Sequence, residues 1–311
     1  MTGSFFIPVS LALQKCWLIY IIFMISSLKK LLLTGSIGIL SISSAYAKHY
    51  KIYVLTGQSN SLGCTTANKN DKKAATPPKD RNDKNIPFFW ANRSTRGGDG
   101  PSTLIGTSDG KITFLKEQQG EGRNKTFWGP EVGFGREMIK QKEQDFLIIK
   151  ASRGGGGNGF WVKDQQMYTH VVQTVKACTD LLDKKKDTYE IVGLLFVQGE
   201  SNKAREAKIA GLRFRDLLDQ LRVDLPKASN MQGYIGGIAA AGGARDLTRT
   251  QQKEMAEKNE DIAYFTNMDL TKHLYDKLHF DTEAKLEIGK RFALAIRKRE
   301  AELAEKSDVK K

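Results

Sequence analysis

The chain has 311 residues, 40% of them hydrophobic, and a formal net charge of +14. Its basic residues are scattered rather than interleaved with aromatic residues along one element, which argues against nucleic-acid binding and suits an acidic polysaccharide or an anionic cell envelope. Three cysteines are too few for a disulfide framework: Cys16 precedes the expected mature chain, and Cys64 and Cys178 could pair or remain free thiols.

The first 47 residues are not expected to belong to the folded domain. From Met24 onward, a basic start, an apolar stretch and small residues before Lys48 follow the order of a secretory signal peptide over residues 24–47. Residues 1–23 are interpreted as an upstream extension, and the alternative is a membrane-anchoring helix over residues 5–27. The mature protein, residues 48–311, is then secreted or periplasmic and contacts a membrane only if residues 1–23 are retained. A charged tail is expected from about residue 300.

The first expected element of the domain is a buried strand over residues 52–55, which leads into the glycine-flanked turn Gly57-Gln58-Ser59-Asn60. A continuous apolar run bounded by turn residues is typical of an inner strand of a parallel sheet. Ligands of open α/β sheets bind beyond the carboxyl ends of the strands, where Ser59 would stand. Taken alone, however, the turn fits a polar loop that merely caps a helix better than it fits a catalytic site.

The remaining elements alternate between strands and helices. A polar loop over residues 65–84, an aromatic segment over 86–90 and a glycine-rich, turn-like stretch over 96–110 come first. Strands are predicted over residues 111–115, 146–149, 191–197, 233–241 and 262–265, and helices from residue 129 and over residues 164–183, 205–225, 249–258 and 282–300. This alternation, without an internal repeat, predicts a single three-layer α/β/α domain with a mainly parallel, flavodoxin-like sheet.

Polar motifs follow three of the expected inner strands, and a histidine motif precedes the last helix. The first is the Ser59 turn, the second is the glycine run that begins at Gly154, and the third is Gln198-Gly199-Glu200-Ser201. A glycine run directly after a buried strand lets the backbone approach a ligand closely. Because the carboxyl ends of parallel strands meet at one edge, these motifs are expected to converge there and form an active site.

Acyl transfer by serine needs a nucleophile, a histidine base, a carboxylate that orients the histidine, and donors to the oxyanion. Ser59 is the candidate nucleophile. The histidines of the expected mature chain are His49, His170, His273 and His279. Only His279 has an aspartate, Asp276, three residues earlier, although an isolated Asp-x-x-His is a weak signal. No cluster of metal ligands is visible in the sequence.

Together, these motifs resemble the SGNH hydrolases, and within them the sialate O-acetylesterase-like carbohydrate esterases. The resemblance rests on Gly57-Gln58-Ser59-Asn60, Gly129-Pro130-Glu131, Gly154-Gly155 followed by Trp161, Gln198-Gly199-Glu200-Ser201, residues 249–252 and Asp276-Lys277-Leu278-His279-Phe280. It spans nearly the whole mature chain in the order of the family.

The resemblance implies a catalytic triad of Ser59, His279 and Asp276, acting through an acetyl-enzyme that water then hydrolyses. The protein would then be a secreted carbohydrate O-acetylesterase that requires no metal or organic cofactor and acts on an acetylated carbohydrate. The alternative is a carbohydrate-binding pseudoesterase without turnover. A lipid or aryl esterase is less favoured because no long apolar lid follows residue 48. The sugar, its linkage and the oligomeric state are left open.

The resemblance also implies the donors to the oxyanion. These are the Ser59 N–H, an N–H of Gly154 or Gly155, and the side-chain amide of Gln198, where broader SGNH hydrolases have asparagine. Residues expected to bind substrate or support the catalytic groups are Gln58, Asn60 and Glu200. The bland alternative for Glu200 is a simple carboxylate at a helix start. The chain departs from the family pattern in its run of four glycines, which leaves the donating glycine open, and in Lys277, where a small residue is common.

Overall fold

The computed structural model describes residues 47–63, 76–94, 101–121, 126–143 and 145–308. The chain divides into two units, Met1–Tyr46 and Ala47–Lys311, and all of the described residues belong to the second. The expected signal peptide therefore lies outside the described residues, except for Ala47. Cys64 and most of the polar loop over residues 65–84 also lie outside them. Cys178, the cysteine that the structure does describe, has a buried free thiol.

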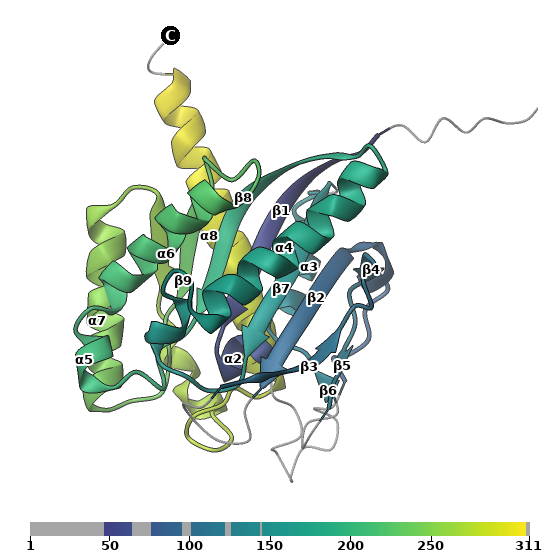
Figure 1. The fold of residues 1–311 in the computed structure, drawn as a ribbon. Helices are drawn as coiled ribbons and strands as arrows, with labels where there is room; N and C mark the ends of the chain where they lie inside the picture. Colours follow the sequence, from purple (N-terminus) through teal and green to yellow (C-terminus); the bar gives the residue numbers. More distant parts are fainter. Residues whose placement is uncertain (1–46, 64–75, 95–100, 122–125, 144, 309–311) are drawn as a thin grey trace, which may run out of the picture. The chain divides into compact units, whose positions relative to one another are not determined.

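The described residues form an eight-stranded sheet with the strand order β10-β9-β8-β1-β7-β2-β3, and β4 pairs with β2 (Figure 1). The strands are β1 (His49–Gly57), β2 (Pro87–Ser94), β3 (Thr103–Thr107), β4 (Thr113–Phe114), β7 (Phe146–Arg153), β8 (Thr188–Val197), β9 (Gln232–Gly236) and β10 (Ile262–Phe265). From β10 to β2 all neighbours are parallel, whereas β3 and β4 run antiparallel to β2. A separate two-stranded sheet pairs β5 (Gln118–Gln119) with β6 (Thr126–Phe127).

Helices cover both faces of this sheet, and the alternation of side chains along β1 shows how. Ile52 and Val54 pack into one core layer with α4 (Gln166–Lys184) and α6 (Ala210–Asp224), while Tyr53 and Leu55 pack into the other with α3 (Pro130–Lys140) and α8 (Thr282–Asp308). Successive strand residues point to opposite faces, so a strand that is apolar throughout is buried on both sides. The predicted three-layer α/β/α domain with a mainly parallel sheet is confirmed (Figure 1).

Several predicted boundaries were wrong. The helix expected over residues 205–225 is two helices, α5 (Ala204–Ala207) and α6, because α5 is a single capped turn that ends before Ile209. The strand expected over residues 233–241 ends at Gly236, where its neighbour β10 also ends at Phe265 and offers no further pairing.

Two further segments differ from their predictions. Within the stretch over residues 96–110 that was expected to be turn-like, Thr103–Thr107 is β3 and pairs with the end of β2. α7 (Gly243–Lys258) begins six residues before the predicted residue 249, and Asp246 in its first turn accepts a hydrogen bond from the Gly242 N–H. The charged segment after residue 300 continues α8 to Asp308. Within the described ranges, the structure contains no helix that combines the length and the apolar character needed to span a membrane.

Candidate active site

The candidate nucleophile lies on a tight turn at the end of β1. Ser59 opens α2 (Ser59–Leu62), a four-residue helix in which every residue is buried. At Gly57 the backbone has φ +143°, and a Cβ there would lie 2.0 Å from the Val197 carbonyl oxygen, so the turn requires glycine. Gly63 closes α2 with φ +80° and donates its N–H to the Ser59 carbonyl at 2.8 Å. Glycines on both sides thus allow the short turn that presents Ser59.

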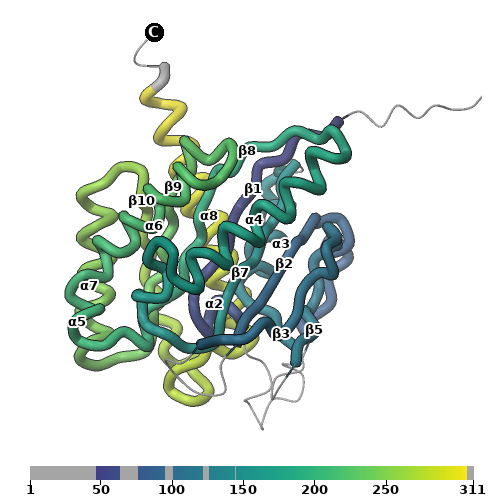
Figure 2. Tube along the Cα trace, viewed as in Figure 1, coloured from purple at the N-terminus to yellow at the C-terminus, as the bar shows by residue number. Residues whose placement is uncertain are grey.

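The structure brings Ser59, His279 and Asp276 into one hydrogen-bonded chain. His279 Nε2 lies 2.9 Å from Ser59 Oγ, and His279 Nδ1 lies 2.6 Å from Asp276 Oδ2. The other Asp276 oxygen accepts the backbone N–H groups of Leu278 and His279 at 3.1 and 2.7 Å. A carboxylate next to Nδ1 favours the tautomer in which Nδ1 carries the proton and Nε2 accepts one from the serine. In Figure 2 the segment before α8 runs beside α2, as these contacts require.

The negative charge of Asp276 favours the same arrangement. Partial burial raises the pKa of Asp276, but the hydrogen bonds from the His279 ring and backbone lower it by more, so the net pKa lies below its ordinary value. The downward shift therefore comes from hydrogen bonding, since burial acts in the opposite direction and the side chain is still 39% exposed. Asp276 is therefore a carboxylate at neutral pH and a hydrogen-bond acceptor for the imidazole.

The loop that carries His279 is closed on itself. Leu274 and Phe280 form an antiparallel bridge, and the Tyr275 N–H donates to the His279 carbonyl at 3.1 Å. The Tyr275 ring also stacks on the His279 ring, with centroids 5.9 Å apart and planes inclined by 24°. Lys277 at the tip has φ +65°, a left-handed conformation that glycine adopts more readily than lysine.

Gln58 connects the nucleophile turn to the motif after β8. Its backbone N–H donates to the Val197 carbonyl at 3.0 Å. Its side-chain oxygen accepts the N–H groups of Gly199 and Ser201, both at 3.2 Å, and its side-chain nitrogen donates to Ser201 Oγ at 3.3 Å. Gln58 is fully buried, so the structure places it as a support beneath the turn rather than as a group that can reach substrate.

Asn60 connects the same turn to the histidine loop and to Glu200. Its side-chain nitrogen donates to Glu200 Oε1 at 2.5 Å and to the Leu278 carbonyl at 3.0 Å, and its oxygen accepts the Phe280 N–H at 3.0 Å. Burial raises the pKa of Glu200, against the opposing effects of the Asn60 hydrogen bond and the nearby Arg245 charge. Glu200 Oε2 is buried and has no hydrogen-bond partner within the described part of the chain. Glu200 thus lies against the nucleophile turn.

The glycine run presents two candidate donors that differ in the structure. The Gly154 N–H donates to the Arg93 carbonyl at 3.1 Å and so continues the pairing of β7 with β2. For the Gly155 N–H, the described residues provide no acceptor. Gly155 and Gly156 have φ +68° and +98°, which turn the chain sharply after β7. The geometry therefore favours Gly155 over Gly154 as a donor to a ligand.

Gln198 lies at the end of β8 and is buried. Its side-chain nitrogen donates to Asn202 Oδ1 at 2.7 Å and to the Gly156 carbonyl at 3.3 Å. Asn202 Oδ1 also accepts the Asn158 N–H at 2.9 Å, which fixes the orientation of both amides. The Gln198 amide can therefore reach an oxyanion only by giving up the longer of its two hydrogen bonds, the one to Gly156.

A family comparison agrees with this geometry. Residues 49–298 match the family described as "Carbohydrate esterase, sialic acid-specific acetylesterase". The chain belongs to this family. It is therefore a carbohydrate acetylesterase, a serine-type carboxylic ester hydrolase. Among curated proteins, no sequence matches it.

Solved structures share the fold of this esterase. An Arabidopsis thaliana protein is 20% identical with a TM-score of 0.54, and the match covers 80% of this chain and 97% of that one. NanS is 15% identical with a TM-score of 0.52, covering 82% and 99% of the two chains. XAC1771 from Xanthomonas citri, described as a novel carbohydrate acetylesterase, is 14% identical with a TM-score of 0.50, covering 79% and 56%. At these identities the likeness concerns the fold.

Sequence reasoning missed Glu206, a carboxylate of the esterase that holds the segment after the glycine run. Glu206 Oε1 accepts the Gly159 N–H at 3.2 Å, and its Oε2 accepts the Lys203 N–H at 2.9 Å. A Cβ on Gly157 would lie 2.1 Å from Glu206 Oε2, so the fourth glycine of this run makes room for the carboxylate. Glu206 accepts the N–H of the N-cap residue as the glutamate of a capping box does, but Lys203 has no side-chain acceptor, so the Ser/Thr-x-x-Glu signal is absent from the sequence.

The other histidines of the esterase lie elsewhere. His170 is buried in α4 with Nε2 2.9 Å from the Ala91 carbonyl, and burial lowers its pKa to about 4. His273 Nδ1 lies 3.0 Å from Asp281 Oδ2, at the start of α8. His49 Nδ1 lies 2.9 Å from Thr188 Oγ1. No group of three or more His, Cys, Asp or Glu that could hold a metal ion occurs among the residues that the structure describes.

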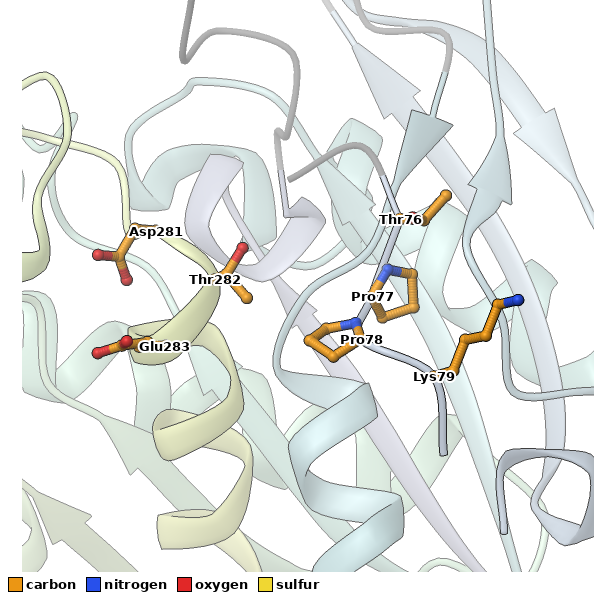
Figure 3. A pocket seen from close by; sticks show the side chains of 7 residues that line it. All are labelled: Thr76, Pro77, Pro78, Lys79, Asp281, Thr282 and Glu283. Carbon is orange, nitrogen blue, oxygen red and sulfur yellow. The ribbon is translucent and has the colours of Figure 1, made fainter. Parts of the chain in front are cut away.

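An open groove of about 520 Å³ is lined in part by the residues that follow the histidine loop in the sequence. It runs between residues 76–79 and 281–283, with Pro77 and Pro78 on one side and Thr282 on the other (Figure 3). The side chains of Asp281 and Glu283 point away from the two prolines (Figure 3). None of the candidate catalytic residues is among the residues that line this groove.

Proposed function

We propose that the protein is an exported carbohydrate O-acetylesterase in which Ser59, His279 and Asp276 form the catalytic triad. The observation that carries the proposal is the chain of short contacts from Asp276 through the imidazole to Ser59 Oγ, at 2.6 and 2.9 Å. A nucleophile within hydrogen-bond distance of a base, which is itself oriented by a carboxylate, is the arrangement that acyl transfer requires.

The reaction follows from the positions of the protons. Ser59 Oγ attacks the acetyl carbonyl and gives its proton to His279 Nε2. The imidazolium, stabilised by Asp276, then passes that proton to the sugar oxygen as the bond from that oxygen to the acetyl carbon breaks. A water molecule, deprotonated by the same imidazole, attacks the acetyl carbon, and the imidazolium returns that proton to Ser59 Oγ as its bond to the acetyl group breaks and acetate leaves. These steps require no redox change.

The developing oxyanion needs preorganised donors. The Ser59 and Gly155 N–H groups and the Gln198 amide are proposed for this role. Gly155 replaces Gly154, whose N–H donates to Arg93. Gln58, Asn60 and Glu200 are proposed to support the turn, because all three are buried and hydrogen-bonded to neighbouring loops.

An acetylated carbohydrate is the substrate that the family implies. The formal net charge is +14, and Lys15, Lys29 and Lys30 precede Lys48, so the mature chain carries 14 − 3 = +11. This charge favours an acidic or anionic glycan, because a positive surface attracts a polyanion before any specific contact forms. Export through a signal peptide over residues 24–47 would bring the enzyme to such a polymer outside the cell.

The test of the triad is Ser59→Ala, assayed for acetate release from an acetylated oligosaccharide. We expect turnover to fall by at least about 10³-fold, since the nucleophile is removed, with an unchanged melting temperature. The matched control is Ser61→Ala in the same turn, whose hydroxyl contacts Ser152 Oγ at 2.7 Å rather than His279, and we expect it to keep turnover within a few-fold of the wild type. Near-normal turnover in Ser59→Ala would show that the nucleophile assignment is wrong.

A further inference from the structure

A buried ion pair lies directly beneath the nucleophile turn. Lys150, near the end of β7, and Glu131, in the first turn of α3, are both fully buried, and Lys150 Nζ lies 2.9 Å from Glu131 Oε1. The reaction proposed above uses neither residue. We infer that this pair is a positioning device that holds Ser59 in place through the last carbonyl of α2.

The ammonium group reaches the turn itself. Lys150 Nζ donates to the Leu62 carbonyl at 2.9 Å, as well as to Gln118 Oε1 at 2.8 Å and to Glu131. Because α2 has four residues, the Leu62 carbonyl lies less than one helical turn beyond Ser59. An ammonium group fixed at this end therefore constrains the whole turn and with it the direction of Ser59 Oγ.

Glu131, the carboxylate of the pair, holds the segment before α3, and this segment packs against the same turn. Glu131 Oε1 also accepts the Gly129 N–H at 2.8 Å and the Gln118 side-chain N–H at 2.9 Å. A Cβ on Gly129 would lie 2.7 Å from the Ser61 carbonyl oxygen, so this segment packs closely against α2. The preceding residue, Trp128, donates its N–H to the Gly63 carbonyl at 3.2 Å.

A role in stability alone does not account for this placement. Replacing a buried ion pair with apolar residues is often neutral or stabilising, so such a pair is weak evidence for stability. Its hydrogen bonds do, however, fix the positions of their partners. Here those partners are the Leu62 carbonyl and the Gly129 N–H before α3. At the other end of the turn, Gln58 holds the backbone against the motif after β8. With both ends held, Ser59 has one orientation toward His279.

The inference rests on the proposed role of Ser59. It predicts that the double variant Lys150→Met/Glu131→Gln, which removes both charges and keeps the side-chain sizes similar, folds but positions the serine poorly. We expect kcat on an acetylated model ester to fall about 10- to 100-fold, the loss typical of a misplacement of about 1 Å, with KM within about twofold of the wild type. Inactivation by a small organophosphate should slow in parallel, while the pH at which kcat rises should not move.

The control is Leu218→Ala in α6, a fully buried residue in the core layer on the opposite face of the sheet. It destabilises the protein without touching α2, so kcat should stay normal well below its melting temperature. If the double variant does not fold, Glu131→Gln alone preserves the shape of the side chain and is also expected to lower kcat at least about fivefold, because Lys150 loses its counter-charge.

The outcomes separate this inference from the proposed function. A folded Lys150→Met/Glu131→Gln or Glu131→Gln enzyme with wild-type kcat and organophosphate reactivity would overturn the positioning role while Ser59→Ala remained inactive. If Leu218→Ala lowered kcat as much as the double variant does, general destabilisation would explain the loss of kcat, and the positioning role would be overturned. An active Ser59→Ala enzyme would instead contradict the proposed function itself.

Discussion

At the residue scale, Gln198 is the side chain whose hydrogen bonds decide its role. Its amide holds Asn202 firmly at 2.7 Å and the Gly156 carbonyl more loosely at 3.3 Å. An amide N–H that makes only a long hydrogen bond in the resting enzyme can donate a shorter one to the substrate oxygen when that oxygen becomes negatively charged. If the Gln198 amide donates to the oxyanion, the interaction is therefore gained in the transition state rather than with bound substrate.

Gln198→Ala is then expected to lower kcat by about 10²–10³-fold, or roughly 3–4 kcal/mol, with KM nearly unchanged. Gln198→Glu should be at least as damaging, because a carboxylate would face the developing negative charge. Steady-state kinetics and a melting curve on the same preparations distinguish this role from a structural one. An enzyme with a lower melting temperature and normal kcat would show that Gln198 only supports Asn202 and the glycine run.

The proposed triad followed from the resemblance of the motifs taken together, because the Ser59 turn alone fits a helix cap and Asp-x-x-His alone is a weak signal. The supporting residues Lys150 and Glu206 could not be predicted. Lys150 directly follows an apolar run in the sequence, and nothing local shows that its ammonium reaches Leu62, 88 residues earlier. Glu206 lies 47 residues from the Gly159 N–H that it accepts. Contacts of this kind depend on how the elements pack, which one sequence does not specify.

At the scale of elements, the prediction succeeded where a strand is buried on both faces. β1, β7 and β8 are continuous apolar runs because helices cover both sides, and their order along the chain was readable. β3 and β4 lie at the antiparallel side of the sheet and carry a mixture of polar and apolar residues, such as Thr103 and Phe114. The pairing of β3 with β2 is set by tertiary contact, so the sequence of β3 resembled a turn-rich loop, whereas β4 lies within the strand predicted over residues 111–115.

The break between α5 and α6 falls at Ile209, whose backbone, with φ −120° and ψ 18°, leaves the helical region. Glu206, in the first turn of α5, accepts the N–H groups of Lys203 and Gly159. Gly211, the second residue of α6, packs closely against α7, because a Cβ there would lie 2.3 Å from the Gln251 carbonyl oxygen. The apolar spacing over residues 205–225 described the buried face of α6 correctly but gave no sign of the turn at its start.

For the whole molecule, His170 links stability to pH. Burial lowers the pKa of His170 from the ordinary 6.5 to about 4; its bond to the Ala91 carbonyl opposes this shift, and the nearby Arg93 charge adds to it. The unfolded chain then binds the proton more readily than the folded one. The contribution of neutral His170 is complete above pH 6.5, declines as the pH falls, and is fully lost below about pH 4.

A shift of this size corresponds to about 3 kcal/mol of unfolding free energy between pH 7 and pH 4. Urea unfolding at a series of pH values measures it directly. His170→Gln remains neutral throughout. Its unfolding free energy should therefore fall by about 3 kcal/mol less between pH 7 and pH 4 than that of the wild type. Two parallel curves, with the variant merely offset from the wild type, would mean that His170 does not titrate as its buried position implies.

The first residues of the domain also bear on where the mature chain begins. Lys48 donates its backbone N–H to Asp187 Oδ1 at 2.9 Å, and its carbonyl accepts the Thr188 N–H at 2.8 Å. β1 begins at the next residue, His49, whose register partner is Thr188. Cleavage after Ala47 would thus leave β1 whole and place a new ammonium group beside the Asp187 carboxylate.

Expression from Met24 in a secreting host should accordingly yield an extracellular or periplasmic protein whose first residue is Lys48. The reason is the small-residue pattern at Ala45 and Ala47, which signal peptidases require on account of their narrow binding pockets. Amino-terminal sequencing of the exported protein measures the cleavage point. The double variant Ala45→Tyr/Ala47→Tyr, which removes the small residues, should accumulate uncleaved in the membrane fraction. An active protein that retained residues 1–23 in the membrane would favour the anchoring helix over residues 5–27 instead, and the enzyme would then work at a membrane surface rather than free of it.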